Sequence, residues 1–551
     1  MSDNLKLAEL LFPDITKTPD DMEAQFPPRN LKEGARVTRL APSPTGFLHF
    51  GNLFTGTVAY RTAKTTDGIF YVRVEDTDQK RKIEGAIEVM LGGLEAFGVK
   101  ADEGVVGENT EKGDYGPYYQ SRRKHIYHVF AKDLVSRDLA YPCFCSAEEL
   151  DKIRAQQENE PQKGYWGKYA KCRNLTLDEI EENIKAGKPW TLRLKSPGNA
   201  ENKCFVDDMI KGKIEMPENV QDIVLLKSDG IPTYHFAHAV DDHLMRTTHV
   251  VRGDEWMSSC PIHLQLFKCL GFKVPKYAHV APIMKEENGG KRKLSKRKDP
   301  EAAVTFYVEE GYPKESVNEY IMTLMNSNFE DWRKTNKDAS IDAFPFNLKK
   351  MSVSGALFDM VKLKDVSKNV ISLMSADTVY DYTAQWAKEY DRELYALLTK
   401  DEGYSKAILS IDRDTPKPRK DIACWSEVKD YVSYFFDEIF ENTLEMPENI
   451  TASMAKEILT AYTAVYNEND TKDEWFQRMK DLCEPLGYTP NVKEYKKNPE
   501  AFKGHVGDVS TVIRVAVTGR RNTPDLYSIM SLLGKEKVME RLNLALKHFS
   551  A

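Results

Sequence analysis

The sequence has no run of about 18 apolar residues, so it offers no candidate for a helix that crosses a membrane. Its first residues, MSDNLKLAELLFPD, lack the basic segment and the apolar segment of a secretory signal. The eight cysteines form no evident disulfide framework in a chain of 551 residues. We therefore expect a cytoplasmic protein that works away from the membrane.

The chain also lacks an excess of positive charge. The chain has 78 Lys and Arg against 85 Asp and Glu, which gives a net charge of −7. This balance excludes nucleic-acid binding through overall attraction, although it leaves room for a local basic surface. No internal repeat and no long low-complexity segment is present, which argues against repeat architectures. The length and the hydrophobic content of 41% fit three or more globular domains.

The chain changes character along its length. Strand-like and helix-like runs alternate over residues 36–138, where IFYVRV (69–74) is a predicted strand. Residues 139–247 begin with a cysteine cluster and contain mixed strand-like runs. Beyond about residue 345 the apolar spacing is almost wholly helical, as in WSEVKDYVSYFFDEIF (425–440). The sequence therefore predicts an α/β part followed by an all-helical part.

The stretch RLAPSPTGFLHFGN (39–52) joins a predicted strand to a predicted helix. It holds two prolines, which stiffen the backbone, and two glycines, which let it bend or let a ligand approach closely. A loop at the carboxyl end of a first parallel strand is a common binding place for a nucleotide. We therefore expect this loop to bind phosphate groups.

A second loop, GGKRKLSKRKDP (289–300), holds six basic residues within the eight positions from Lys291 to Lys298. Alone, this composition fits a solvated basic loop or a localisation patch. It also fits a mobile clamp for a triphosphate, because lysine side chains can neutralise the charge that develops as a phosphate bond breaks.

Together the two loops resemble the signature motifs of class I aminoacyl-tRNA synthetases, His-any-Gly-His and Lys-Met-Ser-Lys-Ser. Further words in the same order resemble glutamyl-tRNA synthetases of the bacterial type. They are FYVRVEDTD (70–78), GPYYQSRR (116–123), GIPTYHFAHAVDDHLMRTTHVVRGDEW (230–256) and, near the end, VIRVAVTGRRNTPDLYSIMSLLGKEKVMERL (512–542).

This resemblance implies ATP-dependent ligation of L-glutamate to the 3′ end of tRNA(Glu) through a glutamyl-adenylate, with Mg²⁺, releasing AMP and pyrophosphate. It implies a Rossmann-like catalytic domain with an acceptor-stem insertion, followed by all-α stem-contact and anticodon-binding domains. The corresponding segments are an N-terminal extension (1–35), the two catalytic halves (36–138 and 248–300), the acceptor-binding insertion (139–247), a stem-contact helical domain (301–375) and an anticodon-binding region (376–551).

The resemblance also implies roles for single residues. His49, Asn52 and Lys296 would be catalytic, although the family often has a second histidine where Asn52 stands. ATP would contact His49, Gly51, Glu255, Trp256, Lys293 and Lys296. Glutamate needs a cation for each carboxylate and an anion for its ammonium group, and the pocket would consist of Arg39, Ser43, Glu75, Tyr234, His238 and Arg252. The family often has an asparagine where His238 stands.

Cys143, Cys145 and Cys172 have the spacing of a small zinc knuckle in the insertion. The sequence offers no convincing fourth ligand; Tyr169 is a candidate of unusual spacing, and a metal-free knuckle is the alternative. In the helical part, Arg520 and Arg521 lie in a predicted turn, TGRRN, that either contacts tRNA or is a solvated basic turn.

Other functions stay open at this point. A glutaminyl-tRNA synthetase would carry a β-barrel anticodon region instead of helices. A shorter paralogue that glutamylates a tRNA base would lack residues 345–551. A non-catalytic tRNA-binding scaffold would not need the intact set of motif residues. No feature of the sequence demands an oligomer, so we expect a monomer.

Overall fold

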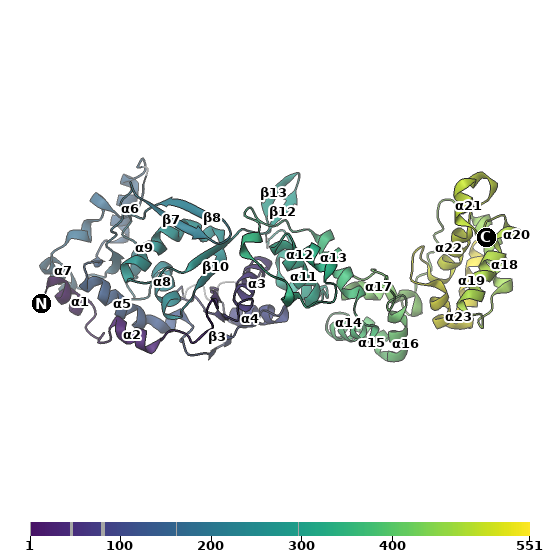
Figure 1. Cartoon of the computed structure of the whole chain (residues 1–551), viewed down its shortest axis with the longest axis horizontal. Helices are drawn as coiled ribbons and strands as arrows, with labels where there is room; N and C mark the ends of the chain where they lie inside the picture. The colour runs from purple at the N-terminus through teal and green to yellow at the C-terminus, as the bar shows by residue number, and fades with distance from the viewer. Residues whose placement is uncertain (1, 45–47, 79–82, 161, 296, 551) are drawn as a thin grey trace. The chain divides into compact units, whose positions relative to one another are not determined.

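The computed structural model describes residues 2–44, 48–78, 83–160, 162–295 and 297–550 (Figure 1). It divides into two compact units. The first contains Met1–Phe306 and Ile321–Asp359, and the second contains Tyr307–Tyr320 and Met360–Ala551. Lys296, the predicted clamp lysine, lies outside the described residues.

Two four-stranded sheets form the centre of the first unit. One has the order β1 (Val37–Leu40), β2 (Ile69–Val72), β3 (Glu103–Gly107) and β4 (Thr110–Lys112). The other has the order β10 (His249–Gly253), β11 (Lys276–Val280), β7 (Lys203–Asp208) and β8 (Gly212–Pro217). They adjoin at β1 and β10, because the Thr248 N–H donates to the Val37 carbonyl at 3.0 Å.

The central strands of these sheets run parallel. Arg39 on β1 lies opposite Tyr71 on β2, and Arg252 on β10 lies opposite His279 on β11. All four residues of β1 are buried, as expected for a parallel strand that is covered on both faces. The order β3-β2-β1-β10-β11 places the ends of β1 and β10 side by side, which is where such sheets bind nucleotides.

Helices and two small sheets complete the first unit. The helices are α1 (Asp3–Leu11), α2 (Pro19–Gln25), α3 (Phe50–Lys64), α4 (Ala86–Ala96), α5 (Lys124–Ser136), α6 (Ala147–Gln156), α7 (Leu177–Lys185), α8 (Tyr234–Leu244), α9 (Cys260–Leu270) and α12 (Phe329–Thr335). The small sheets are β5 (Ala140–Cys143), β6 (Thr191–Leu194) and β9 (Val224–Leu226), and the hairpin β12 (Met284–Glu287) with β13 (Gly290–Lys293). Helices α10 (Val304–Glu309) and α11 (Lys314–Met325) include the residues at which the chain passes between units.

The N-terminal extension packs on both halves of the central sheets. Arg29 makes two hydrogen bonds to Glu103 on β3, at 2.8 and 2.9 Å. Glu23 forms an ion pair with Arg246 and lies at hydrogen-bond distance from His243, both of which precede β10. These contacts tie the extension to segments that are more than 100 residues apart in the chain.

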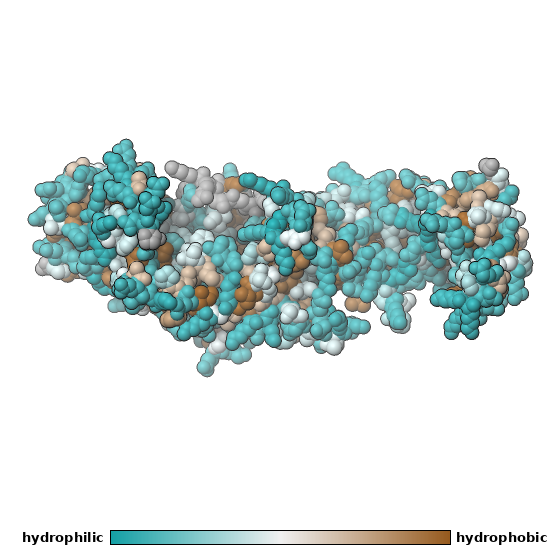
Figure 2. Space-filling view, turned by 90° about the horizontal axis from the view of Figure 1, so that it is seen from above, coloured by the Kyte–Doolittle hydropathy of each residue, from teal (hydrophilic) through white to brown (hydrophobic). Residues whose placement is uncertain are grey.

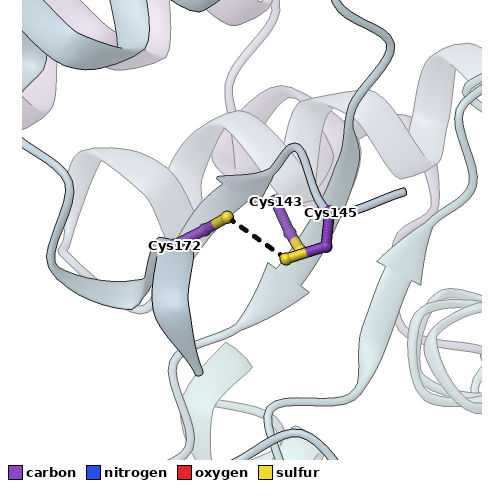
Figure 3. A group of neighbouring side chains, drawn as sticks. All are labelled: Cys143, Cys145 and Cys172. Carbon is purple, nitrogen blue, oxygen red and sulfur yellow. Dashed lines mark hydrogen bonds between the residues drawn. The ribbon is translucent and has the colours of Figure 1, made fainter. Parts of the chain in front are cut away.

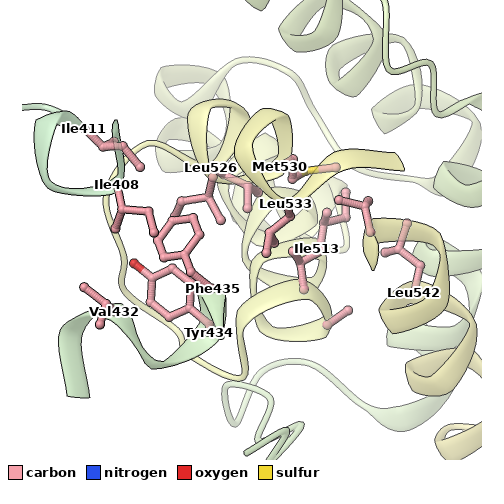
Figure 4. Packing of buried hydrophobic residues seen from close by; sticks show 14 of the residues in the cluster. Ile408, Ile411, Val432, Tyr434, Phe435, Ile513, Leu526, Met530, Leu533 and Leu542 are labelled. Carbon is pink, nitrogen blue, oxygen red and sulfur yellow. The ribbon is translucent and has the colours of Figure 1, made fainter. Parts of the chain in front are cut away.

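The second unit is helical. Its helices are α13 (Met360–Ser372), α14 (Ala376–Tyr390), α15 (Arg392–Lys400), α16 (Glu402–Ser410), α17 (Val428–Val432), α18 (Ala452–Val465), α19 (Lys472–Asp481), α20 (Cys483–Leu486), α21 (Val492–Lys497), α22 (Val506–Thr518) and α23 (Leu526–His548). Residues 360–550, all of which are described, contain no named strand. Buried side chains such as Ile408, Phe435, Ile513 and Leu542 belong to one continuous hydrophobic core (Figure 4).

The predicted helix over 425–440 is shorter than expected. Two 3₁₀ turns (Trp425–Glu427 and Ser433–Phe435) flank α17, and the helical backbone ends at Phe435. The Arg541 guanidinium donates to the Tyr434 carbonyl at 2.7 Å and so satisfies an acceptor that a longer helix would have used. Phe440 still packs against the core, with Arg541 over its ring at 3.6 Å.

Within the described residues, no helix combines the length and the apolar character that a membrane span requires. The face seen in Figure 2 is mostly hydrophilic, and hydrophobic residues form only small patches on it. An α/β part followed by a helical part is the arrangement that the sequence predicts.

Candidate active site

A cavity of about 460 Å³ opens at the carboxyl ends of β1 and β10 in the first unit. Its wall includes most residues of the two predicted pockets: Arg39, Ser43, His49, Gly51, Asn52, Glu75, Tyr234, Arg252, Glu255, Trp256 and Lys293. The structure thus brings side chains from distant parts of the chain to one place, although their individual roles stay predictions.

The first helix after β1 points its N-terminus at this cavity. His49 is the N-cap of α3, and its Nδ1 accepts a hydrogen bond from the Asn52 N–H at 3.3 Å. A side chain at Gly51 would place its Cβ only 3.1 Å from the His49 ring, so glycine allows the imidazole to fold over the helix end. The helix dipole and the first N–H groups favour an anion here.

Two arginines of the cavity region share one buried carboxylate. The Arg39 Nε lies 3.1 Å from Asp242 Oδ1, and the Arg73 Nη1 lies 2.6 Å from the same oxygen. Arg73 also donates to Glu75 at 3.0 Å. Burial raises the pKa of Glu75, and the attraction of Arg73 and Arg39 opposes that rise. Asp242 therefore neutralises part of the positive charge before any substrate binds.

Arg252 has a different environment. Its guanidinium donates to His279 Nε2 at 3.0 Å, to His263 Nδ1 at 3.2 Å and to the Tyr234 hydroxyl at 3.4 Å. The Trp256 carbonyl lies at 3.4 Å. Among the described residues, no carboxylate forms an ion pair with Arg252. Its positive charge is therefore held in place by neutral groups and is not neutralised.

The histidines around Arg252 are uncharged near neutral pH. Burial lowers the pKa of His238 to about 3 and that of His235 to about 4, and it lowers those of His263 and His279 as well. Since these imidazoles carry no charge, they add none to the cavity wall.

His238 does not line the cavity. It is fully buried behind Tyr234, and the two rings stack 5.9 Å apart. Its Nε2 lies 3.1 Å from the Tyr277 hydroxyl, and its Nδ1 lies 2.8 Å from Asp242 Oδ2. The structure therefore does not bring His238 to the cavity wall with the other predicted pocket residues, and its contact with glutamate stays a prediction.

The first part of the predicted clamp loop (289–300) is not a loop: it includes β13, the second strand of a β-hairpin that the sequence analysis missed. Asn288 and Gly289, at φ +52° and +77°, form the turn between β12 and β13. An Asn-Gly pair is the usual signal for such a turn. Beyond the hairpin, the buried Asp299 accepts hydrogen bonds from Arg292 at 2.6 Å and from the Ser295 N–H at 2.8 Å. These bonds lower the pKa of Asp299 and hold the start of the clamp segment.

The three cysteines of the insertion lie together. Their sulfurs are all within 4.8 Å of one another and point toward a common centre (Figure 3). Cys145 Sγ is 3.7 Å from Cys172 Sγ and 3.3 Å from the Tyr165 hydroxyl. The hydroxyl of Tyr169, the candidate fourth ligand, instead donates to Glu160 at 2.9 Å. Tyr165 is thus the nearest oxygen donor in the cluster, and its irregular spacing gave no signal in the sequence.

Known proteins share this chain's architecture. Residues 36–365 match the family described as tRNA synthetases class I (E and Q), catalytic domain, and residues 393–546 match the anticodon binding domain. A glutamate–tRNA ligase of Clostridium perfringens is 52% identical over 97% of this chain and 99% of its own. Another, from Acetivibrio thermocellus, is 52% identical over 98% of this chain and 99% of its own.

The chain belongs to the glutamate–tRNA ligase family.

A solved structure supports membership of this family. A glutamate tRNA ligase from Elizabethkingia meningosepticum, crystallised in complex with its amino acid, has a TM-score of 0.73 at 27% identity, over 93% of this chain and 99% of that chain. The predicted fold class is confirmed: a class I synthetase catalytic domain with mixed sheets and helices, followed by a helical anticodon-binding part.

The predicted tRNA-contact turn of this ligase family member connects α22 and α23, with Gly519 at φ +70°. Arg520 donates to both oxygens of Asp430, at 2.5 and 2.7 Å, and to the Ser433 hydroxyl. Among the residues that the structure describes, Arg521 donates to the carbonyls of Glu445 and Met446 and to no carboxylate. Of the two guanidiniums, that of Arg521 is the one whose charge no carboxylate in the described residues neutralises.

Sequence reasoning missed the charged and polar residues behind the cavity. These residues are Arg73, Asp208, Asp242, His263 and His279, all buried. Asp242 and His263 lie on helices and the other three on or beside strands. The one available signal was the presence of ionisable residues inside runs that otherwise read as apolar strand and helix.

Proposed function

We propose that this protein ligates L-glutamate to the 3′ end of tRNA(Glu). A carboxylate oxygen of glutamate attacks the α-phosphorus of ATP and pyrophosphate leaves; a ribose hydroxyl of the tRNA then attacks the glutamyl carbonyl and AMP leaves. The observation that carries the proposal is the positive charge of Arg252 without a carboxylate partner, in the same cavity as the N-terminus of α3. Names of relatives that match nearly the whole chain support it.

Glutamate would occupy the end of the cavity near Arg252. Arg252 and Arg39 would hold its carboxylates, and Glu75 would hold its ammonium group, with the hydroxyls of Ser43 and Tyr234 nearby. A buried cation that has only neutral partners gains most from an anion. We place the side-chain carboxylate of glutamate on Arg252. A glutamine amide at that position would leave the charge without a counterion, so the pocket favours glutamate over glutamine.

ATP would occupy the other end. The α3 N-terminus and His49 would receive its phosphates, while Glu255 and Trp256 would flank the adenosine. Lys293 and Lys296 would stabilise the charge on the departing pyrophosphate. Mg²⁺, when it is bound with ATP, would neutralise part of the triphosphate charge.

Zinc is a further part of the proposal. In a tetrahedral site with zinc–sulfur bonds of about 2.3 Å, sulfurs lie roughly 3.8 Å apart. The Cys145–Cys172 distance of 3.7 Å fits this value, and the Tyr165 hydroxyl lies 3.3 Å from Cys145 Sγ. We propose that Cys143, Cys145 and Cys172 hold a structural zinc, with Tyr165 in place of Tyr169.

The surroundings of the protein are also proposed. None of the eight cysteines, all of which the structure describes, forms a disulfide, which fits a reducing compartment, and we place the protein in the cytoplasm. We propose that it works as a monomer and that the second unit contacts the tRNA anticodon. Size-exclusion chromatography with light scattering, with and without tRNA, measures the oligomeric state directly.

The test is aminoacylation with glutamate and with glutamine, each on purified tRNA(Glu) and tRNA(Gln), with ATP and Mg²⁺. Glutamate on tRNA(Glu) should give the fastest charging. Charging with glutamine alone would assign a glutaminyl-tRNA synthetase instead. Absence of charging in all four combinations, with tRNA binding retained, would assign a non-catalytic scaffold. The tRNA(Gln) arm also decides whether the enzyme charges one tRNA or two.

A further inference from the structure

Three buried side chains on adjacent strands form a line that ends at Arg252. Asp208 ends β7, His279 lies on β11, and Arg252 lies on β10. His279 is the direct register partner of Arg252, and Asp208 is the partner of Tyr277 on β11. All three are almost fully buried: Asp208 is 3% exposed, His279 0% and Arg252 6%. Burying charged and polar side chains in a sheet costs free energy unless hydrogen bonds or a function compensate for it.

The hydrogen bonds of the line are well defined. The Asp208 Oδ2 lies 2.7 Å from His279 Nδ1 and accepts the His279 backbone N–H at 3.0 Å. Its Oδ1 accepts the N–H groups of Ile210 and Lys211, both at 2.9 Å. The carboxylate is therefore fixed by the turn that follows β7.

Arg252 determines which nitrogen of His279 carries the proton. An arginine can only donate hydrogen bonds, so His279 Nε2, which is 3.0 Å from Arg252 Nε, must be the acceptor. The proton then lies on Nδ1 and is donated to Asp208. The same logic holds for His263, whose Nδ1 accepts from Arg252 and whose Nε2 donates to His235 Nδ1 at 3.0 Å.

The result is a cation fixed in orientation and left unneutralised. His279 and His263 contact different nitrogens of the guanidinium, and the Tyr277 ring lies 4.9 Å from its central carbon. The negative charge of Asp208 is separated from the guanidinium by the neutral imidazole. If Asp208 contacted Arg252 directly, it would compete with the carboxylate of a substrate.

We propose that Asp208 and His279 are positioning residues that set the orientation of the Arg252 guanidinium and thereby the preference for glutamate over glutamine. The proposal rests on the proposed function, in which Arg252 binds the side-chain carboxylate of glutamate, the group that glutamine lacks. It adds that selectivity depends on the Asp208 carboxylate, which contacts His279 and is separated from Arg252 by the His279 imidazole. Neither residue lines the cavity.

The test compares His279→Leu with His279→Gln. Leucine cannot accept the Arg252 N–H, whereas the glutamine side-chain oxygen can. For His279→Leu we expect the KM for glutamate to rise about 10- to 100-fold, the range for a lost hydrogen bond to a charged group, with the KM for ATP unchanged. The ratio of kcat/KM for glutamate to that for glutamine should fall in parallel. His279→Gln should recover most of both values.

A matched control is His249→Gln on the same strand as Arg252. His249 is buried, and its Nδ1 lies 2.8 Å from the Thr248 hydroxyl rather than near Arg252. This variant should keep the wild-type KM for glutamate. If His279→Leu does not fold, as judged by its thermal transition, Asp208→Asn replaces it. This variant should also raise the glutamate KM alone, but less than His279→Leu, because His279 can still accept the Arg252 N–H.

Two results would overturn the proposal. One is a folded His279→Leu enzyme with wild-type glutamate KM and selectivity. The other is an equal rise in the KM for glutamate and ATP, which would indicate a general structural role. Failure of the proposed function looks different, because wild-type enzyme would then show no glutamate charging at all.

Discussion

Arg252 in the first unit and Arg520 in the second were both predicted from family motifs. The groups that contact their guanidiniums differ in charge. Arg252 is buried, and its hydrogen-bond acceptors are imidazoles, a phenol, a carbonyl and the Cys260 thiol, all neutral. The Arg520 side chain is 33% exposed and makes a two-pronged ion pair with Asp430. The Arg252 guanidinium therefore has no anionic partner among the described residues, whereas the Arg520 guanidinium is already paired with Asp430.

The difference shows how a motif arginine should be judged. An arginine that is paired in the free protein must break that pair before it binds a phosphate or a carboxylate, so its net gain is small. An arginine held by neutral acceptors gains the full attraction of the ligand. Arg39 is intermediate, because it shares Asp242 with Arg73.

The largest effect should come from Arg252→Gln. Removal of the buried cation should cost roughly 2–5 kcal/mol of transition-state stabilisation, because the substrate carboxylate then lacks a charged partner. The value of kcat/KM for glutamate should therefore fall about 30- to 4,000-fold. Steady-state charging at varied glutamate measures this. Arg520→Gln is the matched control and should leave glutamate kinetics unchanged. Equal glutamate kinetics in both variants would remove the distinction between the two arginines.

Lys296→Ala should slow catalysis next most strongly. Loss of one charge at the departing pyrophosphate should raise the barrier by roughly 2–4 kcal/mol, with little change in the KM for ATP. Single-turnover charging with enzyme in excess reports the step, and Lys298→Ala in the same segment is the control. If Lys296→Ala keeps the wild-type single-turnover rate, Lys296 has no part in the chemistry.

Zinc should affect the insertion more than the chemistry. Purified protein washed with a weak chelator should hold about one zinc per chain, and Cys145→Ser should release it and lower the thermal transition temperature, because the metal joins segments 20–30 residues apart. Metal analysis by mass spectrometry measures the content. Cys204→Ser, which alters a cysteine outside the cluster, should keep the metal. Metal-free wild-type protein would favour the metal-free knuckle.

The smallest effects belong to the turn between α22 and α23. Arg521→Ala should weaken tRNA use by about 1–3 kcal/mol if the side chain contacts a base, and less if it contacts only phosphate. Arg520→Ala should change tRNA use less, because Asp430 already holds its charge, and should lower stability by at most about 1 kcal/mol. The measurement is the KM for tRNA(Glu) of the Arg521→Ala and Arg520→Ala variants, each compared with wild type. A larger effect at Arg520 would reverse the comparison.

The site residues that could be predicted from the sequence are those that lie within contiguous family motifs. Arg39, His49, Glu75, Tyr234 and Arg252 each stand in a motif, and all five line the cavity. The Asn288–Gly289 turn was readable and would have predicted the hairpin before the clamp.

The buried residues behind the cavity wall, and Tyr165 in the cysteine cluster, could not be predicted from local sequence motifs. Asp208 reaches Arg252 only through the pairing of β7 with β11, and that pairing joins segments about 70 residues apart. Tyr165 enters the cysteine cluster through a loop with no regular spacing. Tertiary pairing, rather than local pattern, decides such contacts.

The most direct test of the account is a competition assay on tRNA(Glu) with glutamate and glutamine present together. The amino acids released from the charged tRNA are separated and counted. An unneutralised Arg252 predicts that glutamate is attached almost exclusively, by a factor of at least about 1,000 at equal concentrations, since an amide leaves the buried charge unpaired. Comparable attachment of both amino acids, or a preference for glutamine, would contradict the claim that this arginine selects the substrate.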